Sequence, residues 1–290
     1  MPDIAGTRPP RNGFATVKGR ANFLRHGAIF ADAPAPDSVI LSFQGPGIFY
    51  NIVDESGQFL IKGVATKKAT LHKVIIEGYK FDKKTGNTIW AVDKRKTTKA
   101  RYRVKVTKRQ METDLVMFPC RQTTILNLLE PRTFQYMTKV QILDARTDAT
   151  PIRHWYSRID TRSSTISSIY LPPGTRLKLA LSDTLLTKKL ILIHSDNVHS
   201  NKIHSNKNQA NGYRIDEAPT IAPTQYLAAR DMWSLLNPRI DNLEEKGINN
   251  RKIRELRTKG NQALEDAKLN FEKLKYDKFF NSAGTSLALA

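Results

Sequence analysis

The chain has few acidic residues, a single cysteine and no long hydrophobic run, and each shortage excludes a class of protein. Its 27 Asp and Glu stand against 47 Lys and Arg, which gives a formal net charge of +20 over 290 residues. One cysteine, Cys120, excludes an internal disulfide and a zinc site made from cysteines. No run reaches the roughly 18 uncharged apolar residues that a membrane-spanning helix needs. The first residues, MPDIAGTRPPRNG, lack the apolar segment of a signal peptide.

Motifs that carry catalysis are also missing. There is no Gly-x-Ser-x-Gly elbow, no His-Glu-x-x-His and no glycine-rich phosphate loop. The carboxylates are scattered and form no constellation of the kind an acid–base site needs. No histidine is arranged to activate the Cys120 thiol, so we expect a small buried hydrophobic residue there. The sequence therefore predicts a protein that is not an enzyme, with no catalytic residue and no cofactor.

Three of the six histidines, His194, His199 and His204, lie five residues apart in a polar segment that also contains Asp196. One interpretation is a flexible metal site, since histidine is a common ligand. The other is a solvated polar loop. A spacing of five places residues on one face of neither a helix nor a strand, which favours the loop. We therefore predict no metal ligand.

The basic character is concentrated in the first 110 residues, which hold 21 basic and 8 acidic side chains. Residues 94–109, KRKTTKARYRVKVTKR, contain nine basic side chains and no acidic one. The second half alternates, so the pattern predicts a strand with Tyr102, Val104 and Val106 on its core face. The opposite face and the preceding cluster form a candidate anionic-surface site: Lys94, Arg95, Lys96, Arg101, Arg103 and Lys105.

Three uses of this basic stripe stay open. It could contact anionic lipid headgroups or an acidic partner, bind the phosphates of a nucleic acid, or be only a soluble basic face. Nucleic acid is the less favoured partner, because the sequence contains no zinc finger, helix-turn-helix or Arg-Gly-rich segment. The predicted partners are an anionic membrane surface or other protein subunits, with no small-molecule substrate.

Short strands between turn signals dominate the first two thirds of the chain. Clusters such as APAPDS, QGPG, DESG and DKKTGN recur at roughly ten-residue spacing, which is typical of a β-sandwich. The fold class predicted is mainly β with an α-helical C-terminus. Its parts are a flexible N-terminus (1–14), a β-sandwich (15–108), a second β-rich domain (109–196), a polar linker (197–221) and a helical hairpin (222–290).

The hairpin is predicted from apolar residues at helical spacing after residue 222. Asn237-Pro238 begins either a second helix or a kinked continuation of the first, and Gly247 ends it. Trp233 should be the main buried anchor. Gly260 should weaken the last helix by about 1 kcal/mol relative to Ala. The expected apolar stripe of that helix is Ile253, Leu256, Ala263, Ala267, Phe271 and Leu274.

Residues 54–79, DESGQFLIKGVATKKATLHKVIIEGY, resemble the carboxypeptidase regulatory-like, or transthyretin-like, β-sandwich family. The family pattern is Asp-x-x-Gly-x-Phe-x-Ile/Leu, a spacer, and an alternating strand that ends in Gly-Tyr. The positions that match are Asp54, Gly57, Phe59, Ile61, Gly63, Leu71, Gly78 and Tyr79. Lys68-Ala69-Thr70 stands where the family usually has Gly-x-Tyr. The resemblance covers residues 15–108 and implies a non-catalytic β-module.

Residues 222–290 are similar to a segment of large bacterial envelope proteins, in which regulatory-like β-domains precede membrane helices of an ABC-transporter-permease type. This resemblance implies that the chain is a piece of a longer membrane protein. It further implies an extracytoplasmic location, in the periplasm or cell envelope; without it the chain would be cytoplasmic. The function expected is non-catalytic binding or scaffolding in a membrane-associated protein, with a basic nucleic-acid-binding protein as the alternative.

Overall fold

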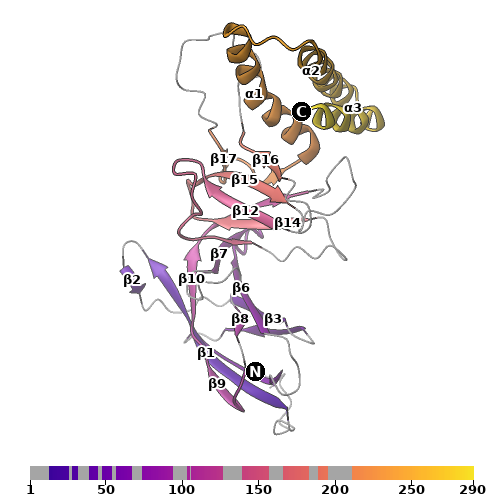
Figure 1. The fold of residues 1–290 in the computed structure, drawn as a ribbon. Helices are drawn as coiled ribbons and strands as arrows, with labels where there is room; N and C mark the ends of the chain where they lie inside the picture. The colour runs from indigo at the N-terminus through magenta and orange to yellow at the C-terminus, as the bar shows by residue number, and fades with distance from the viewer. Residues whose placement is uncertain are drawn as a thin grey trace. The chain divides into compact units, whose positions relative to one another are not determined.

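The chain is mainly β with an α-helical C-terminus, as the sequence predicts (Figure 1). The computed structural model describes residues 13–25, 28–31, 39–44, 48–53, 57–66, 74–93, 103–104, 106–126, 139–156, 166–182, 189–194 and 211–290. The chain divides into two compact units. The first consists of Met1–Gln122, Ile152–Trp155 and Tyr170–Pro173, and the second of Thr123–Pro151, Tyr156–Ile169 and Gly174–Ala290.

The first unit is a β-sandwich. Its strands follow the path β2-β1-β10-β7-β6-β3-β4, with β5 and β9 paired to β1 and β8 paired to β6. The strands are β1 (Phe14–Arg25), β2 (Ala28–Ala31), β3 (Val39–Gln44), β4 (Ile48–Ile52), β5 (Gln58–Ala65), β6 (Val74–Phe81), β7 (Thr88–Val92), β8 (Arg103–Val104), β9 (Gln110–Glu112) and β10 (Leu115–Pro119).

The long strand β1 takes part in both layers of the sandwich. Its first half, from Phe14 to Arg20, pairs with β5, and Thr16–Lys18 pair with β9 on the other side. Its second half pairs with β10 and β2 instead. Period-two alternation buries Ala15, Val17, Ala21 and Phe23 on one face, which explains why the strand runs through both layers without turning its apolar side to water.

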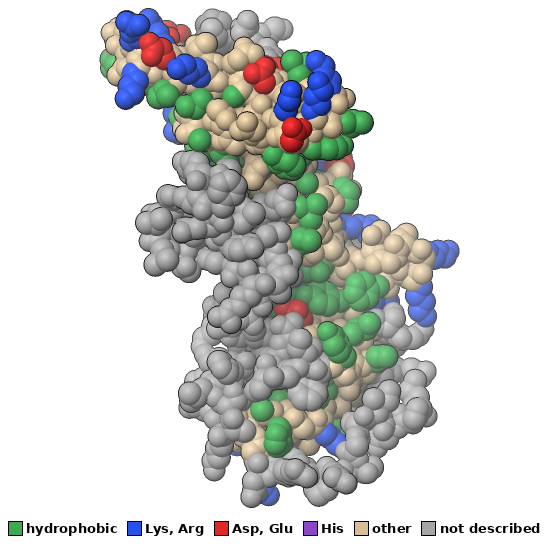
Figure 2. Space-filling view, turned by 90° about the vertical axis from the view of Figure 1, so that its right-hand side faces the viewer, with side chains coloured by type: hydrophobic (Ala, Val, Ile, Leu, Met, Phe, Trp, Pro, Cys, Tyr) green, Lys and Arg blue, Asp and Glu red, His purple; other side chains and the backbone are tan. Residues whose placement is uncertain are grey.

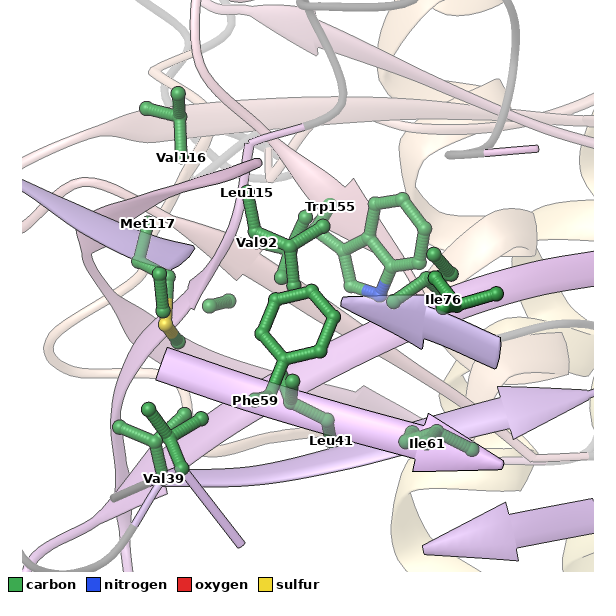
Figure 3. Packing of buried hydrophobic residues seen from close by; sticks show 14 of the residues in the cluster. Val39, Leu41, Phe59, Ile61, Ile76, Val92, Leu115, Val116, Met117 and Trp155 are labelled. Carbon is green, nitrogen blue, oxygen red and sulfur yellow. The ribbon is translucent and has the colours of Figure 1, made fainter. Parts of the chain in front are cut away.

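The core of the first unit lies between these layers. Phe59 and Ile61 of β5 meet the inward side chains of β3, β6, β7 and β10, which include Leu41, Ile76 and Met117, and Figure 3 shows these side chains pointing into one interior. Cys120 belongs to the same core and is 1% exposed. Burial raises the pKa of its thiol to about 12. The prediction of a buried Cys120 is confirmed.

The first unit extends beyond the predicted boundary at residue 108. Strand β9 pairs with β1 in parallel, and β10 pairs with β1 in parallel and with β7 antiparallel. The sequence pattern assigns both strands to the second β-rich domain instead. Their partner β1 lies about a hundred residues earlier in the chain, so no local pattern reveals the pairing.

Two further four-stranded sheets follow. One has the order β13-β14-β11-β18, in which β11 and β18 run parallel. The other has the order β12-β15-β16, with β17 paired to β15. The strands are β11 (Arg121–Ile125), β12 (Lys139–Asp144), β13 (Trp155–Tyr156), β14 (Ser167–Leu171), β15 (Arg176–Ser182), β16 (Lys189–Leu192), β17 (Tyr213–Arg214) and β18 (Thr220–Ile221).

Three helices, rather than the predicted two-helix hairpin, end the chain: α1 (Thr224–Glu245), α2 (Arg251–Glu272) and α3 (Tyr276–Leu289). Helix α1 continues through Pro238 without a break, so Asn237-Pro238 begins no new helix. The Asn250 side chain caps α2 by accepting from the backbone N–H groups of Lys252 and Ile253. No helix among the described residues is both long enough and apolar enough to cross a membrane.

The turn between α1 and α2 ends the first helix as predicted. Gly247 has a φ of +79°, a conformation that glycine adopts without steric cost. Its N–H donates to Glu244 O at 2.9 Å, and the N–H of Ile248 donates to Leu243 O at 2.9 Å. This pair of bonds is a Schellman motif with glycine at its left-handed position.

The three helices meet around Trp233, which is 2% exposed, and the prediction of a buried anchor is confirmed. Its Nε1 donates to Ser286 Oγ at 3.1 Å, and the Ser286 hydroxyl donates to Gly260 O at 2.8 Å. A Cβ at Gly260 would lie 2.0 Å from Trp233 Cζ2. Gly260 is therefore required for close packing against the indole, a role that outweighs its intrinsic cost in a helix.

The buried face of α2 differs from the predicted stripe. Ala267 is buried as predicted, but Gly260 and Leu264 are buried as well, whereas Ile253 and Phe271 are 40% and 46% exposed. Helix α2 packs mainly on α3, a helix that the sequence pattern does not predict, and this changes which side of α2 faces inward.

Candidate functional site

The predicted basic stripe falls largely outside the described residues. Lys94, Arg95, Lys96, Arg101 and Lys105 lie outside them, and Arg103 is described only as part of strand β8. There Arg103 pairs with Ile75 of β6, which pairs on its other side with Gln44 of β3. The core-facing half of the pattern is tested at one position: Val106 is 3% exposed and belongs to the core of the first unit.

Of the three clustered histidines, His194 is described, and His199 and His204 lie outside the described residues. His194 is half-buried, and its ring centroid lies 4.7 Å from that of Tyr213. Within the described ranges, no three His, Cys, Asp or Glu side chains come together in a group that could hold a metal ion.

A buried polar cluster around Asp231 in α1 was not predicted. Asp231 is 0% exposed. Its Oδ2 accepts from the backbone N–H of Ile193 at 2.7 Å, from the N–H of His194 at 3.0 Å and from the Tyr213 hydroxyl at 3.4 Å. Its Oδ1 accepts from Arg230 Nε and Nη2 at 3.1 and 3.0 Å. We call Asp231, Ile193, His194, Tyr213 and Arg230 the Asp231 cluster.

The electrostatics of this cluster match its burial. Removal from water raises the pKa of Tyr213, and the negative charge of Asp231 raises it further. Tyr213 therefore stays a neutral donor. Both oxygens of Asp231 are engaged by donors, as a buried carboxylate requires. The cluster thus fastens α1 to the end of β16 and to β17.

A second buried polar cluster lies in the first unit. Trp155 Nε1 donates to the Tyr79 hydroxyl at 2.9 Å, and that hydroxyl donates to Glu77 Oε2 at 3.3 Å. The rings of Tyr79 and Tyr170 lie 5.1 Å apart. Burial raises the pKa of Tyr79, and the nearby Glu77 carboxylate adds to the rise. These side chains hold β6 to the segments that carry Trp155 and Tyr170.

The positions that carry the family resemblance have structural roles where they are described. Phe59 and Ile61 are core residues, 4% and 5% exposed. A Cβ at Gly78 would lie 2.7 Å from Leu41 Cδ2, so this position admits only glycine without a shift in the core. Tyr79 makes the hydrogen bonds given above. Asp54 and Leu71 lie outside the described residues.

Sequence reasoning missed the Asp231 cluster although one signal was present. Asp231 follows Ala228 and Ala229 and precedes Trp233, so a carboxylate stands on the apolar side of an amphipathic helix. A buried acid at such a position needs donors nearby. Those donors are backbone groups 37 and 38 residues away in the sequence, which no spacing rule identifies.

Comparisons with known proteins identify no family. No family model matches the chain, and no curated protein matches it. Among solved structures, the Bacillus anthracis TIE protein is 6% identical with a TM-score of 0.23, and the chain covers 31% of it with 62% of its own length. The shaft pilin SpaA from Lactobacillus rhamnosus GG is 5% identical with a TM-score of 0.23 and coverages of 59% of this chain and 88% of the pilin.

A third likeness is to a streptococcal ancillary pilin, 9% identical with a TM-score of 0.21, covering 62% of this chain and 58% of the pilin. TM-scores this far below 0.5 do not establish a common fold. The functions of these proteins therefore do not carry over to this chain, and its own residues must support any proposal.

Proposed function

We propose that this chain is a non-catalytic scaffolding region of a bacterial membrane-associated protein on the extracytoplasmic side. The observation that carries the proposal is the Asp231 cluster. It fastens α1 to a β-sheet through a carboxylate with no exposed surface. A buried charge held by backbone donors is suited to fixing one arrangement of helix and sheet. Fixing the position of a helical bundle is what a scaffold requires.

Within the first unit, the resemblance to the carboxypeptidase regulatory-like family supports the same proposal. Its described motif positions pack a sandwich core or join strands, as Phe59, Gly78 and Tyr79 do. The resemblance implies a β-module that carries or positions other parts of a protein. In this proposal, the basic stripe Lys94, Arg95, Lys96, Arg101, Arg103 and Lys105 faces anionic lipid headgroups.

The alternative, a nucleic-acid-binding protein driven by its net charge of +20, is separated from the scaffold by one titration. A fluorescent single-stranded oligonucleotide is titrated with the chain as salt is raised. A scaffold with a generic basic surface should bind weakly and lose that binding at modest salt. Tight binding at physiological ionic strength, with a preference for sequence or structure, would replace our proposal with the alternative.

The membrane part of the proposal is tested with the basic stripe itself. The six residues are changed together to Gln, and cosedimentation with phosphatidylglycerol-containing vesicles is measured. Each Lys or Arg near an anionic surface contributes about 1 kcal/mol, so six losses should reduce binding sharply. Vesicle binding equal to that of the unchanged chain would remove the stripe from the proposal.

A further inference from the structure

The corner between α2 and α3 exposes large apolar side chains among lysines. We call residues 268–280 the α2–α3 corner. Its exposed charged side chains are four lysines, Lys268, Lys273, Lys275 and Lys278, and two acids, Glu272 and Asp277, which leave the corner a net charge of +2. Its apolar side chains are exposed as follows: Leu269 48%, Phe271 46%, Leu274 70%, Tyr276 50% and Phe280 42%. Over the helices at the top of Figure 2, basic and acidic side chains lie among hydrophobic ones.

Ring contacts join the aromatic side chains of the corner. The Phe271 ring lies 6.1 Å from Tyr276 and 5.1 Å from the buried Phe279, and Phe279 lies 5.0 Å from Phe280. An open hollow of about 490 Å³ also lies on the surface that α2 and α3 form, and of the five exposed apolar side chains it is lined by Leu269 alone. Its lining residues are Asp266, Leu269, Asn270, Lys273, Lys278, Asn281 and Ser282.

Leu274, the most exposed of the five, has a backbone conformation that does not suit leucine. Its φ is +57°, in the left-handed region. Its N–H donates to Phe271 O at 3.0 Å and the Lys275 N–H donates to Asn270 O at 2.9 Å, which makes a Schellman motif. Glycine is the usual residue there, because a side chain is penalised. Since Leu274 also buries little surface, folding does not account for a leucine at this position.

The composition of the corner distinguishes between the partners that could cover it. Among the described residues, none of the four lysines has an ion-pair partner. Lysine is depleted in protein–protein interfaces. Single-stranded nucleic acids stack bases on aromatic rings, which Phe271, Tyr276 and Phe280 could provide, but the exposed Leu269 and Leu274 have no role in stacking. Aliphatic and aromatic side chains with lysines around them are typical of segments that lie in the interface of an anionic bilayer.

We propose that the α2–α3 corner inserts into the interface of an anionic lipid bilayer. Leu274 and the neighbouring rings enter the boundary between headgroups and acyl chains, and Lys273 and Lys278 contact lipid phosphates at the hollow. This inference rests on the proposed membrane association, but it assigns a contact surface in the second compact unit, whereas the basic stripe lies in the first.

A fluorophore at residue 274 tests insertion directly. The full chain with Leu274→Cys is labelled with an environment-sensitive thiol dye. Cys120 is buried and its thiol pKa is about 12, so it stays unlabelled. The emission should shift to the blue on addition of phosphatidylglycerol-containing vesicles and stay constant with pure phosphatidylcholine. Ile248→Cys, at the other interhelical turn and 59% exposed, is the matched control and should show no shift.

Charge is tested with Lys273→Gln/Lys278→Gln. At about fivefold per lysine, the vesicle partition coefficient should fall about 25-fold. The control pair Lys246→Gln/Lys252→Gln removes two exposed lysines near the Gly247 turn and should change partition by less than a few fold. Equal losses in both pairs would mean diffuse attraction to the whole basic surface and would overturn the insertion proposal.

The remaining outcomes separate this inference from the proposed function. If the chain binds vesicles and the six-residue stripe variant does not, while the probe at 274 stays in water, the corner proposal is wrong and the scaffold proposal stands. A blue shift that grows with protein concentration without lipid would indicate self-association and overturn the corner proposal. A shift caused by an oligonucleotide instead of vesicles would do the same.

Discussion

The two turns that join the three helices have the same hydrogen-bond pattern but different residues at the left-handed position. Both are Schellman motifs with a left-handed residue, Gly247 with a φ of +79° after α1 and Leu274 with a φ of +57° after α2. Glycine adopts the left-handed conformation without steric cost, whereas leucine in the same conformation raises the energy of the turn. Gly247 therefore suits the turn, whereas for Leu274 we propose a role at the bilayer.

The same contrast separates the interior of the helical bundle from its α2–α3 corner. Inside, Trp233, Gly260 and Ser286 fit together, and Asp231 has a donor for each of its oxygens. At the corner, side chains such as Leu274 and Tyr276 are at least half exposed. If this contrast is correct, stability should depend on the interior and on Gly247, and should be insensitive to Leu274.

The largest effect is expected from Trp233→Ala. Removing a buried indole leaves a cavity between three helices and should lower the free energy of unfolding by about 3–5 kcal/mol. Thermal and denaturant unfolding followed by helical circular dichroism measures it. An unchanged melting curve would mean that Trp233 does not hold the helices together. It would contradict the proposed difference between the interior of the bundle and the α2–α3 corner.

Gly260→Ala is the control that links this loss to the observed packing. Alone, it should destabilise by about 1–3 kcal/mol, because the new methyl group overlaps the indole. In the Trp233→Ala background the overlap is gone, and the higher helix propensity of Ala should make the same change neutral or stabilising by up to about 1 kcal/mol. Additive losses in the double variant would show that the two residues do not interact.

The next effect is expected from Asp231→Asn. An amide cannot accept on both sides, so donors from the backbone or from Arg230 lose their acceptor, at a cost of about 2–3 kcal/mol. The matched control is Asp241→Asn in the same helix. Asp241 is 51% exposed and its Oδ1 lies 2.6 Å from Arg257 Nη1, a surface pair whose loss should cost less than about 1 kcal/mol. Similar losses of stability in both variants would show that the Asp231 cluster contributes no more than a surface ion pair.

Local patterns predict the elements of this fold better than their partners. Alternation identifies the buried faces of strands, as Val106 and Phe59 show, because side-chain period is a property of the strand itself. The membership of β9 and β10 in the first unit is not predictable, because it depends on pairing with β1. Likewise, the sequence alone predicts only that Gly260 lowers the stability of α2. Its packing against Trp233 can be recognised only once the position of Trp233 is known.

The candidate site follows the same division. The basic stripe is visible in the sequence because its charges are closely spaced, and it stays a prediction. Asp231 is visible only as an acid within an apolar helix face. The periodic pattern places Leu274 in the buried stripe of the last helix, whereas α2 ends at Glu272 and Leu274 is 70% exposed in the turn that follows. Because a third helix begins after α2, the end of the predicted stripe falls in the α2–α3 corner. The number of helices is the feature that the periodic pattern did not predict.

A smaller effect is expected from Gly247→Leu, which gives the first turn the residue of the second. A leucine in the left-handed region costs about 1–2 kcal/mol, and chemical denaturation should show a loss of that size. The change adds an exposed apolar side chain at the α1–α2 turn, where we propose no membrane contact. Vesicle binding should therefore stay constant. A gain in binding equal to the contribution of Leu274 would show that any exposed leucine suffices.

The smallest effect on stability is expected from Leu274→Gly, the reciprocal change. Glycine relieves the left-handed penalty but is more flexible in the unfolded chain, and these opposing effects leave stability within about 1 kcal/mol of the original. Vesicle partition should nevertheless fall at least about tenfold, because an inserted leucine side chain contributes about 1.5–3 kcal/mol when buried. Melting temperature and vesicle cosedimentation are measured on the same sample.

Two results of this reciprocal change would contradict the contrast between the turns. A Leu274→Gly variant that loses more than about 2 kcal/mol of stability would show that Leu274 holds the turn together, because its contacts would then outweigh the cost of about 1–2 kcal/mol that its left-handed conformation carries. A variant that keeps both stability and binding would leave Leu274 without a role at the bilayer. The difference between Gly247 and Leu274 would then have to be explained by another partner.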